Sequence, residues 1–258
     1  MRWQFIDNGF SDGRTNMKAD EDLARRLVEA SGLPTVRVYG WNPPAISLGW
    51  NQSKDEILHE KARREGVDVV RRPTGGRAIL HAGELTYCVV MSVAEGTSVS
   101  EVYRHVSEGL LAGLEDLGVS ASLEKSQPHF PSLYRNPDSV SCFVSSARHE
   151  IKVSGRKLVG SAQRRYRGRD AREIVLQHGS ILIDPSHRAI VRYLALDEDR
   201  RASMAQLLRE RTTDLSEILE RTVSFEEVAE AIRKGMERAW EIEFDDSPEL
   251  MSTGRAGR

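Results

Sequence analysis

Apolar runs along the first half of the chain are short and are separated by longer amphipathic stretches. Runs rich in β-branched and aromatic residues predict strands at residues 3–6, 35–39, 45–49, 67–71, 78–81 and 85–91. Leucines at helical spacing predict a helix over residues 16–30. Two capping boxes predict one helix that runs from Ser53 to about Glu65 and a long helix that follows Ser98.

The second half begins with an irregular stretch over residues 120–147 and then becomes regular again. We expect extended segments at 149–153, 157–162 and 174–183, helices from residue 184 onward, and an edge strand near 240–244. Strands with few intervening helices favour an α+β fold, with a mixed, largely antiparallel sheet flanked by helices. We expect a domain core at 1–185, a helical segment at 186–245 packed on the same domain, and a disordered tail at 246–258.

Composition excludes several classes of protein. The 258 residues carry 37 Lys and Arg against 39 Asp and Glu, a formal charge of −2, which argues against a protein that coats nucleic acid. No apolar run approaches the roughly 20 residues of a membrane-spanning helix, and the first residues lack a signal pattern, so we expect a cytoplasmic protein that does not bind membranes. Two cysteines form no disulfide framework and make a poor zinc site, so we expect no metal and at least one free thiol.

The segment 71–77, RRPTGGR, is the most unusual string in the chain. Adjacent glycines let the backbone approach a ligand closely, and the flanking arginines suit a carboxylate or a phosphate. The simpler alternative is a hairpin turn whose arginines point into water. The string is not a P-loop, because the Gly-Lys-Ser/Thr ending is missing.

The segment 153–163, VSGRKLVGSAQ, reads as a strand, a tight turn and a second strand. Lys157 begins the second strand, and the small residues Gly160, Ser161 and Ala162 leave room for a ligand to lie against it. The alternative is a hairpin lysine that simply reaches solvent.

The two cysteines have different surroundings. Cys88 lies within the apolar run 85–91, which is typical of a buried structural thiol. Cys142 lies in a Ser-rich, loop-like stretch, where a nearby ammonium group would favour the thiolate. An unreactive loop residue is the alternative, but if either thiol is catalytic we expect it to be Cys142.

The segment 164–172, RRYRGRDAR, holds five arginines and one aspartate. The ordinary interpretation is a solvated hairpin, although so strong a local charge often meets an acidic partner. Nucleic acid is a weaker alternative, because the neighbouring predicted helices show no matching basic face.

Together these strings resemble the lipoate–protein ligase A-like family of the lipoyl/biotinyl transferase superfamily, in family order over roughly residues 1–185. The strings that carry the resemblance are WxFID at 3–7, NM at 16–17, DE at 20–21, NPP at 42–44, SLG at 47–49 with Gln52, the stretch 71–81, ELTY at 84–87, CF at 142–143, the stretch 155–163 and QHGSIL at 177–182. Two features resemble the octanoyltransferases of the family rather than its ligases. Arg77 replaces the third glycine of the ligase string RRxTGGGAVxH, and Cys142 falls at the position of a transferase nucleophile.

The resemblance implies transfer of an octanoyl group from acyl carrier protein to a lysine of a lipoyl-carrying protein, such as glycine cleavage H protein, without a cofactor. It implies that Cys142 is the nucleophile and that Lys157 lies against the acyl carbonyl. It implies substrate binding by Arg71, Arg72, Gly75, Gly76, Arg77, His81, Gly160, Ser161 and Ala162, and carrier docking by Arg164, Arg165 and Arg167. For His81 and His178 a packing or hydrogen-bonding role is favoured over catalysis.

Three alternatives remain open from the sequence. An ATP-dependent lipoate–protein ligase would use ATP and Mg²⁺ and would not need Cys142. A second kind of transferase would move octanoyl between two lipoyl-carrying proteins. A non-catalytic subunit that binds carrier proteins would keep the arginines and would need no thiol.

Overall fold

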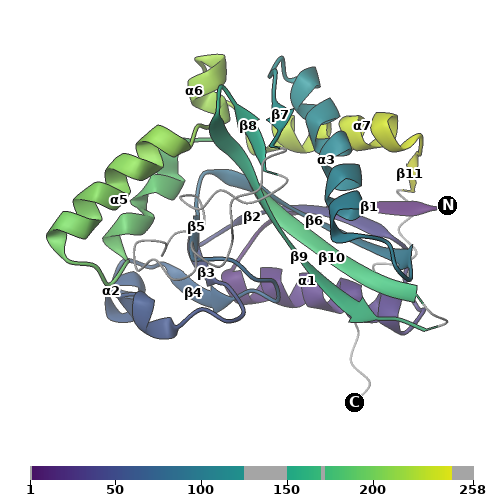
Figure 1. Ribbon diagram of the computed structural model, residues 1–258, viewed down its shortest axis with the longest axis horizontal. Helices are drawn as coiled ribbons and strands as arrows, with labels where there is room; N and C mark the ends of the chain where they lie inside the picture. Colours follow the sequence, from purple (N-terminus) through teal and green to yellow (C-terminus); the bar gives the residue numbers. More distant parts are fainter. Residues whose placement is uncertain (1, 125–149, 170–171, 246–258) are drawn as a thin grey trace.

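The computed structural model describes residues 2–124, 150–169 and 172–245, which form two sheets with helices packed around the larger one (Figure 1). The strands are β1 (Trp3–Ser11), β2 (Thr35–Trp41), β3 (Ala45–Leu48), β4 (Asp68–Arg71), β5 (Ile79–His81), β6 (Glu84–Ala94), β7 (Ser122–Leu123), β8 (Ile151–Val153), β9 (Arg156–Arg167), β10 (Arg172–Leu182) and β11 (Phe244–Asp245). The helices are α1 (Gly13–Val28), α2 (His59–Arg64), α3 (Val99–Asp116), α5 (Glu198–Arg211), α6 (Leu215–Leu219) and α7 (Phe225–Trp240), with 3₁₀ turns η1 (Lys54–Glu56) and η2 (Pro185–Arg192).

The large sheet has the strand order β11-β1-β2-β6-β10-β9-β8-β7, and the small sheet has the order β4-β3-β5. Strands β11, β1 and β2 run parallel to one another, and every further pair in the large sheet is antiparallel. The small sheet contains one parallel and one antiparallel pair. This mixed, largely antiparallel arrangement with flanking helices confirms the α+β fold expected from the sequence.

Helices cover both faces of the large sheet, because alternate residues of its central strands are apolar on both sides. Helix α1 packs Met17, Leu23 and Ala24 on one face, against the side of the sheet that carries Cys88 and Leu176. Helices α3 and α7 lie on the opposite face (Figure 1).

Helices α3 and α7 cross at two glycines. A Cβ atom added to Gly235 would meet the backbone nitrogen of Gly113 at 2.1 Å, so only hydrogen fits at this contact. The backbones of α3 and α7 are therefore in direct contact where the two helices cross over the sheet.

One predicted helix is broken. Ser53 caps a short 3₁₀ turn instead of the helix expected to run to Glu65, and the α-helix that follows begins only at His59. Between the two, Ile57 is extended, is 4% exposed and forms a β-bridge with Leu194. Burial of this isoleucine and its bridge to Leu194 therefore override the local helical preference of the capping box.

Two other segments differ from the sequence-based expectation. Strand β9 continues past the predicted end at residue 162 to Arg167 and pairs with β10, so the hairpin expected for the basic segment 164–172 is present with longer strands. Residues 240–244 were expected to form the edge strand, but Trp240 ends α7 and only Phe244–Asp245 pair with β1 at the edge.

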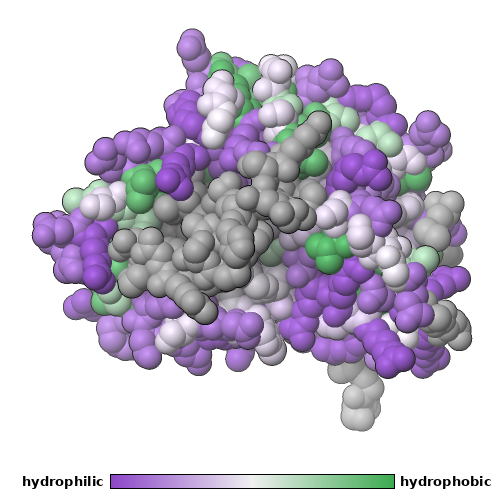
Figure 2. Space-filling view, in the orientation of Figure 1, coloured by the Kyte–Doolittle hydropathy of each residue, from purple (hydrophilic) through white to green (hydrophobic). Residues whose placement is uncertain are grey.

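The 29% of charged residues in the chain predicts a largely polar surface. On the face shown in Figure 2, most of the described surface is hydrophilic. Within the described ranges, none of the helices has the length and apolar character that crossing a membrane requires.

Candidate active site

A pocket lies across four strands of the large sheet, on the face that α1 covers. Residue pairing places one row of residues directly opposite one another, in the order Tyr39 (β2), Thr86 (β6), Ser180 (β10) and Gly160 (β9). Together with the open space at its mouth, the pocket spans about 430 Å³. Its lining residues are Met17, Tyr39, Trp41, Ser47, Arg72, Ile79, His81, Thr86, Lys157, Gly160, Ser161, Ala162, His178, Gly179 and Ser180.

Small residues on β9 and β10 create the space for the pocket. A Cβ atom on Gly179 would meet the carbonyl oxygen of Gly160 at 2.3 Å, so the two strands are closely packed at this level. Gly160, Ser161 and Ala162 line the pocket, as the sequence-based interpretation requires of residues that lie against a ligand.

Lys157 is buried at the β9 end of the pocket. Its exposed fraction is 4%, and its Nζ donates to Oε1 of Glu150 at 2.6 Å. The backbone holds the residue as well, since the Lys157 carbonyl accepts the N–H of Thr213 at 3.0 Å. The alternative in which this lysine reaches solvent is therefore wrong.

Of the two cysteines, only Cys88 lies within the described residues. Cys142 lies outside the described residues. Cys88 is fully buried on β6, and burial followed by the charge of Asp20 raises the pKa of its thiol well above the ordinary value. Cys88 is therefore a protected structural thiol.

The glycine loop, residues 74–77, is held by the arginines that precede it. Arg72 is 3% exposed, and its guanidinium donates to the carbonyls of Gly75 and Arg77. Arg71 donates to the carbonyls of residues 49, 50 and 52. The alternative of a hairpin with both arginines in water is wrong, because these side chains serve as hydrogen-bond donors to two loops.

The glycines themselves fit a close approach of two backbones. Gly76 has a positive φ of 99°, and a Cβ atom on Gly49 would meet the Gly76 carbonyl oxygen at 1.9 Å. Arg77 is partly buried and lies 3.5 Å from a carboxylate oxygen of Glu56.

The structure brings six of the sequence-predicted residues together at the pocket and leaves four beside it. The six that line the pocket are Arg72, His81, Lys157, Gly160, Ser161 and Ala162. The four that do not line it are Arg71, the last residue of β4, and the glycine-loop residues Gly75, Gly76 and Arg77.

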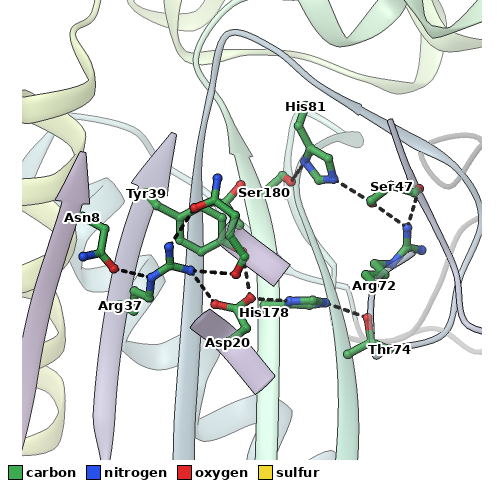
Figure 3. Close-up of polar contacts among 12 residues, drawn as sticks. Asn8, Asp20, Arg37, Tyr39, Ser47, Arg72, Thr74, His81, His178 and Ser180 are labelled. Carbon is green, nitrogen blue, oxygen red and sulfur yellow. Dashed lines mark hydrogen bonds and ion pairs between the residues drawn. The ribbon is translucent and has the colours of Figure 1, made fainter. Parts of the chain in front are cut away.

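A chain of hydrogen bonds runs from Glu84 to the glycine loop, and Figure 3 shows its central part, from His81 through Ser47 to Arg72. Oε1 of Glu84 lies 2.8 Å from Nδ1 of His81, and Nε2 of His81 lies 2.7 Å from the hydroxyl of Ser47. Because a carboxylate only accepts, Nδ1 carries the proton, and in the neutral ring Nε2 accepts from Ser47. Ser47 in turn accepts from Arg72, which holds Gly75.

A second chain reaches the same loop from the large sheet. Asp20 is completely buried on α1, and its Oδ2 lies 3.0 Å from Nδ1 of His178. Nε2 of His178 lies 2.7 Å from the hydroxyl of Thr74, the first residue of the glycine loop. Both histidines therefore join a buried carboxylate to a hydroxyl group, and both line the pocket.

Asp20 keeps its charge because it is surrounded by donors. Burial alone would raise the pKa of this carboxyl, but the hydrogen bond from His178 and the charge of Arg37 outweigh it and lower the pKa below the ordinary value. Nη1 of Arg37 donates to Asp20 at 2.7 Å, and the hydroxyl of Tyr39 donates at 2.8 Å. Burial, and then the adjacent Asp20 charge, raises the pKa of Tyr39 well above its ordinary value.

Comparison with known families decides what this site belongs to. The chain matches the model of the lipoyl protein ligase A/B catalytic domain over residues 12–237. It is 38% identical over 247 residues to octanoyltransferase LipM of Geobacillus kaustophilus, covering 93% of this chain and 87% of that protein. It is 36% identical over 250 residues to octanoyltransferase LipM of Bacillus subtilis, covering 94% and 88%. The chain belongs to the lipoyl protein ligase A/B catalytic domain family. The resemblance drawn from the sequence strings is confirmed.

Solved structures of lipoyl protein ligases share the fold. A bipartite lipoate protein ligase from Thermoplasma acidophilum superposes with a TM-score of 0.74 at 21% identity, covering 96% of this chain and 87% of that one. A lipoate-protein ligase A bound with ATP superposes with a TM-score of 0.73 at 20% identity, covering 96% and 89%. At these identities the likeness establishes the fold.

Several site residues of this lipoyl protein ligase A/B domain were missed by the site prediction. Asp20, Ser47, Thr74, Glu84 and Ser180 hold or line the pocket, and each lies in a string that carried the family resemblance. Their roles depend on contacts between residues far apart in the sequence. The only sequence signal for them was their place in the family strings DE, SLG, RRPTGGR, ELTY and QHGSIL.

The arginines of β9 alternate between the two faces of the domain's large sheet. Arg164 is on the pocket face, where it donates to the carbonyl of Pro73 at 3.0 Å and lies over the half-exposed ring of Trp50, 4.5 Å from its centroid. Arg165 points to the other face and binds Glu173 and the carbonyl of Thr97. Arg167 is exposed at the end of the strand.

Proposed function

We propose that this protein is an octanoyltransferase, which moves an octanoyl group from a carrier-protein thioester to the ε-amine of a lysine on a lipoyl-carrying protein. The observation that carries the proposal is the similarity, over 93% and 94% of the chain, to two proteins named octanoyltransferase LipM. The pocket supports it, because a buried lysine lies at one end of a cavity whose surface is mostly carbon. An alkyl chain gains about 0.8 kcal/mol for each CH₂ group that it buries in such a cavity.

In the first step of the proposed reaction, the thiolate of Cys142 attacks the carbonyl carbon of the donor thioester. A new carbon–sulfur bond forms, the bond to the carrier's sulfur breaks, and that sulfur leaves as a thiolate that takes up a proton. The acyl group is then a thioester of Cys142, at an energy close to that of the donor.

In the second step, the amine of the acceptor lysine attacks the same carbonyl carbon. The carbon–nitrogen bond forms, the bond to Cys142 breaks, and the proton lost by the amine returns to the departing thiolate. Exchange of a thioester for an amide is downhill, so the cycle consumes no ATP.

Lys157 serves both steps in this proposal. Its ammonium group, fixed by Glu150 and by the backbone contact to Thr213, is a preorganised positive charge at the pocket. A fixed charge beside a developing oxyanion typically contributes a few kcal/mol to transition-state stabilisation. The same charge favours the thiolate form of a neighbouring cysteine.

The donor in this proposal is acyl carrier protein, and the acceptor is a lipoyl domain or glycine cleavage H protein. We propose that Arg164 and Arg167 contribute most to docking of these acidic carriers. Arg165 contributes least, because its guanidinium is already shared between Glu173 and the Thr97 carbonyl. Trp50 is half-exposed beside Arg164, and its backbone N–H donates to the Thr74 carbonyl, so its ring adds an aromatic surface next to the glycine loop.

Intact-mass analysis after mixing the protein with octanoyl carrier protein, in the absence of ATP, tests the proposal. We expect the mass of one octanoyl group on the wild type and on the Cys88→Ala variant, and none on the Cys142→Ala variant. Addition of an acceptor domain should then remove the group from the enzyme and place it on the acceptor. Octanoylation that needs ATP and free octanoic acid would contradict the proposal and select the ligase. Octanoylation that persists in Cys142→Ala without ATP would rule out covalent catalysis at Cys142.

A further inference from the structure

One oxygen atom of Glu84 holds three of the pocket's polar side chains. Oε1 accepts from Nδ1 of His81 at 2.8 Å, from the hydroxyl of Thr86 at 2.6 Å and from the hydroxyl of Ser180 at 2.7 Å. Glu84 is 5% exposed and does not itself line the pocket. Among the residues with described positions, no hydrogen-bond partner lies near its second oxygen, Oε2.

Two more polar groups of the pocket wall, on Trp41 and Ser47, are bonded to the side chains that Glu84 holds. Thr86 accepts the indole N–H of Trp41 at 2.7 Å, and Trp41 is stacked on His81 with their ring centroids 4.1 Å apart. Through His81, the hydroxyl of Ser47 is engaged as well. One carboxylate therefore fixes, directly or through one intermediate, five polar side chains that line the cavity.

The consequence is a polar wall that presents carbon to the cavity. Serine, threonine, histidine and tryptophan make up much of the lining, yet the surface that faces the cavity is mostly carbon. Each hydroxyl or ring N–H has one proton to donate, and these protons are already directed behind the wall. A ligand atom in the cavity therefore meets mainly carbon atoms.

We propose that Glu84 determines the selectivity of this pocket for an unfunctionalised alkyl chain over a chain that carries a polar group. A hydroxyl on the acyl chain that reaches this part of the wall finds the donors of His81, Thr86 and Ser180 already bonded to Glu84, so it is buried without a hydrogen bond from them. A pocket of this kind rejects a hydroxylated analogue by about 100-fold. The inference concerns binding by the pocket, and it rests on the proposed function only for the identity of the chain.

Removal of Glu84 should relax this selectivity. In Glu84→Ala the donors of His81, Thr86 and Ser180 lose their common acceptor, and they become available to a ligand hydroxyl. Glu84→Gln keeps the shape and one oxygen acceptor but loses the charge, so it should have the same effect to a smaller degree. Ser180→Ala is the matched control, because it deletes one donor of the same cluster and leaves no donor without an acceptor.

The experiment compares the dissociation constants of octanamide and ω-hydroxyoctanamide by calorimetry, because binding of these neutral amides does not depend on turnover. We expect the wild type and Ser180→Ala to prefer octanamide by about 100-fold, Glu84→Ala by about 10-fold or less, and Glu84→Gln by an intermediate factor. A wild-type preference near unity, or the full wild-type preference in a folded Glu84→Gln variant, would overturn the inference. Octanoyl transfer is measured on the same preparations: its absence from the wild type, with the expected ratios intact, counts against the proposed function alone.

Discussion

Nε2 of His178 and the hydroxyl of Thr74 lie 2.7 Å apart and join strand β10 to the glycine loop across 104 positions of sequence. His178 is itself fixed by Asp20, and Thr74 is 1% exposed. This buried hydrogen bond therefore holds the loop together with the hydrogen bonds from Arg72.

Thr74→Val should destabilise the protein and slow transfer. Valine keeps the shape of threonine, but Nε2 of His178 then stays buried without a donor, which costs about 1–3 kcal/mol. Thr74→Ser keeps the hydroxyl and should preserve most of the stability and the rate. Urea unfolding and octanoyl transfer measured on both variants check this. Equal losses in the two variants would mean that the methyl group, and not the hydrogen bond, matters at this position.

Lys157 and Glu150 form a buried pair whose structural and chemical roles can be separated. Their side chains are 5% and 3% exposed. Lys157→Met leaves the Glu150 carboxylate buried without its cation, and we expect a loss of about 3–5 kcal/mol in unfolding free energy together with loss of octanoyl transfer.

The double variant Lys157→Met/Glu150→Leu removes both charges and should recover most of that stability, since a buried ion pair can be replaced by apolar residues at little cost. It should not recover transfer, because the ammonium group is still missing. Unfolding curves and acceptor octanoylation give the two readouts. Recovery of transfer in the double variant would show that Lys157 acts only through stability.

Arg164 and Arg165 are neighbours in sequence with different expected effects on carrier binding. Arg164→Gln removes a charge from the pocket face beside Trp50, so KM for the carrier proteins should rise about two- to fivefold at low salt. The effect should disappear at high ionic strength, where exposed charges are screened.

Arg165→Gln provides the comparison. This variant loses the ion pair with Glu173 on the opposite face of the sheet, so we expect up to about 1 kcal/mol less stability and a smaller change in KM. Steady-state kinetics at two salt concentrations distinguish the variants. A larger KM effect in Arg165→Gln would place carrier docking on the other face.

The sequence predicted those helices and strands whose formation depends on residues close together in the chain. The capping box at Ser98 is present as expected, and the strands of the first half lie within a few residues of their predicted bounds. The helix expected from Ser53 does not form, because Ile57 is extended and pairs with Leu194 instead. These two residues are too far apart in the sequence for a local pattern to reveal their contact.

The site shows the same limit. The string around Lys157 predicted room for a ligand, but its spacing alone favoured a solvated lysine, which the buried hydrogen bond from Lys157 to Glu150 excludes. The anchoring role of Asp20 could not be predicted, because it depends on Arg37 and His178, which come from two other elements. The placement of Arg164 and Arg165 on opposite faces could not be predicted, because the predicted strand ended at residue 162 and β9 continues through both arginines.

His187 gives the protein a specific dependence of stability on pH. Burial, and then the charge of Arg188, lowers the pKa of His187 from 6.5 to about 4, and its Nε2 lies 2.8 Å from the buried hydroxyl of Thr212. The unfolded chain binds a proton at this residue as the pH falls below 6.5, whereas the folded protein does not until about pH 4. The contribution of His187 is therefore fully present above pH 6.5 and is lost as the pH falls toward 4.

The difference between the two pKa values corresponds to roughly 3 kcal/mol of unfolding free energy. His187→Gln keeps a group that can bond Thr212 and does not titrate, so its stability should fall less than that of the wild type between about pH 7 and about pH 4.5. Urea unfolding of both proteins across this range measures the difference, and other titrating groups cancel in the comparison. Parallel curves for the two proteins would show that His187 has an ordinary pKa in the folded state.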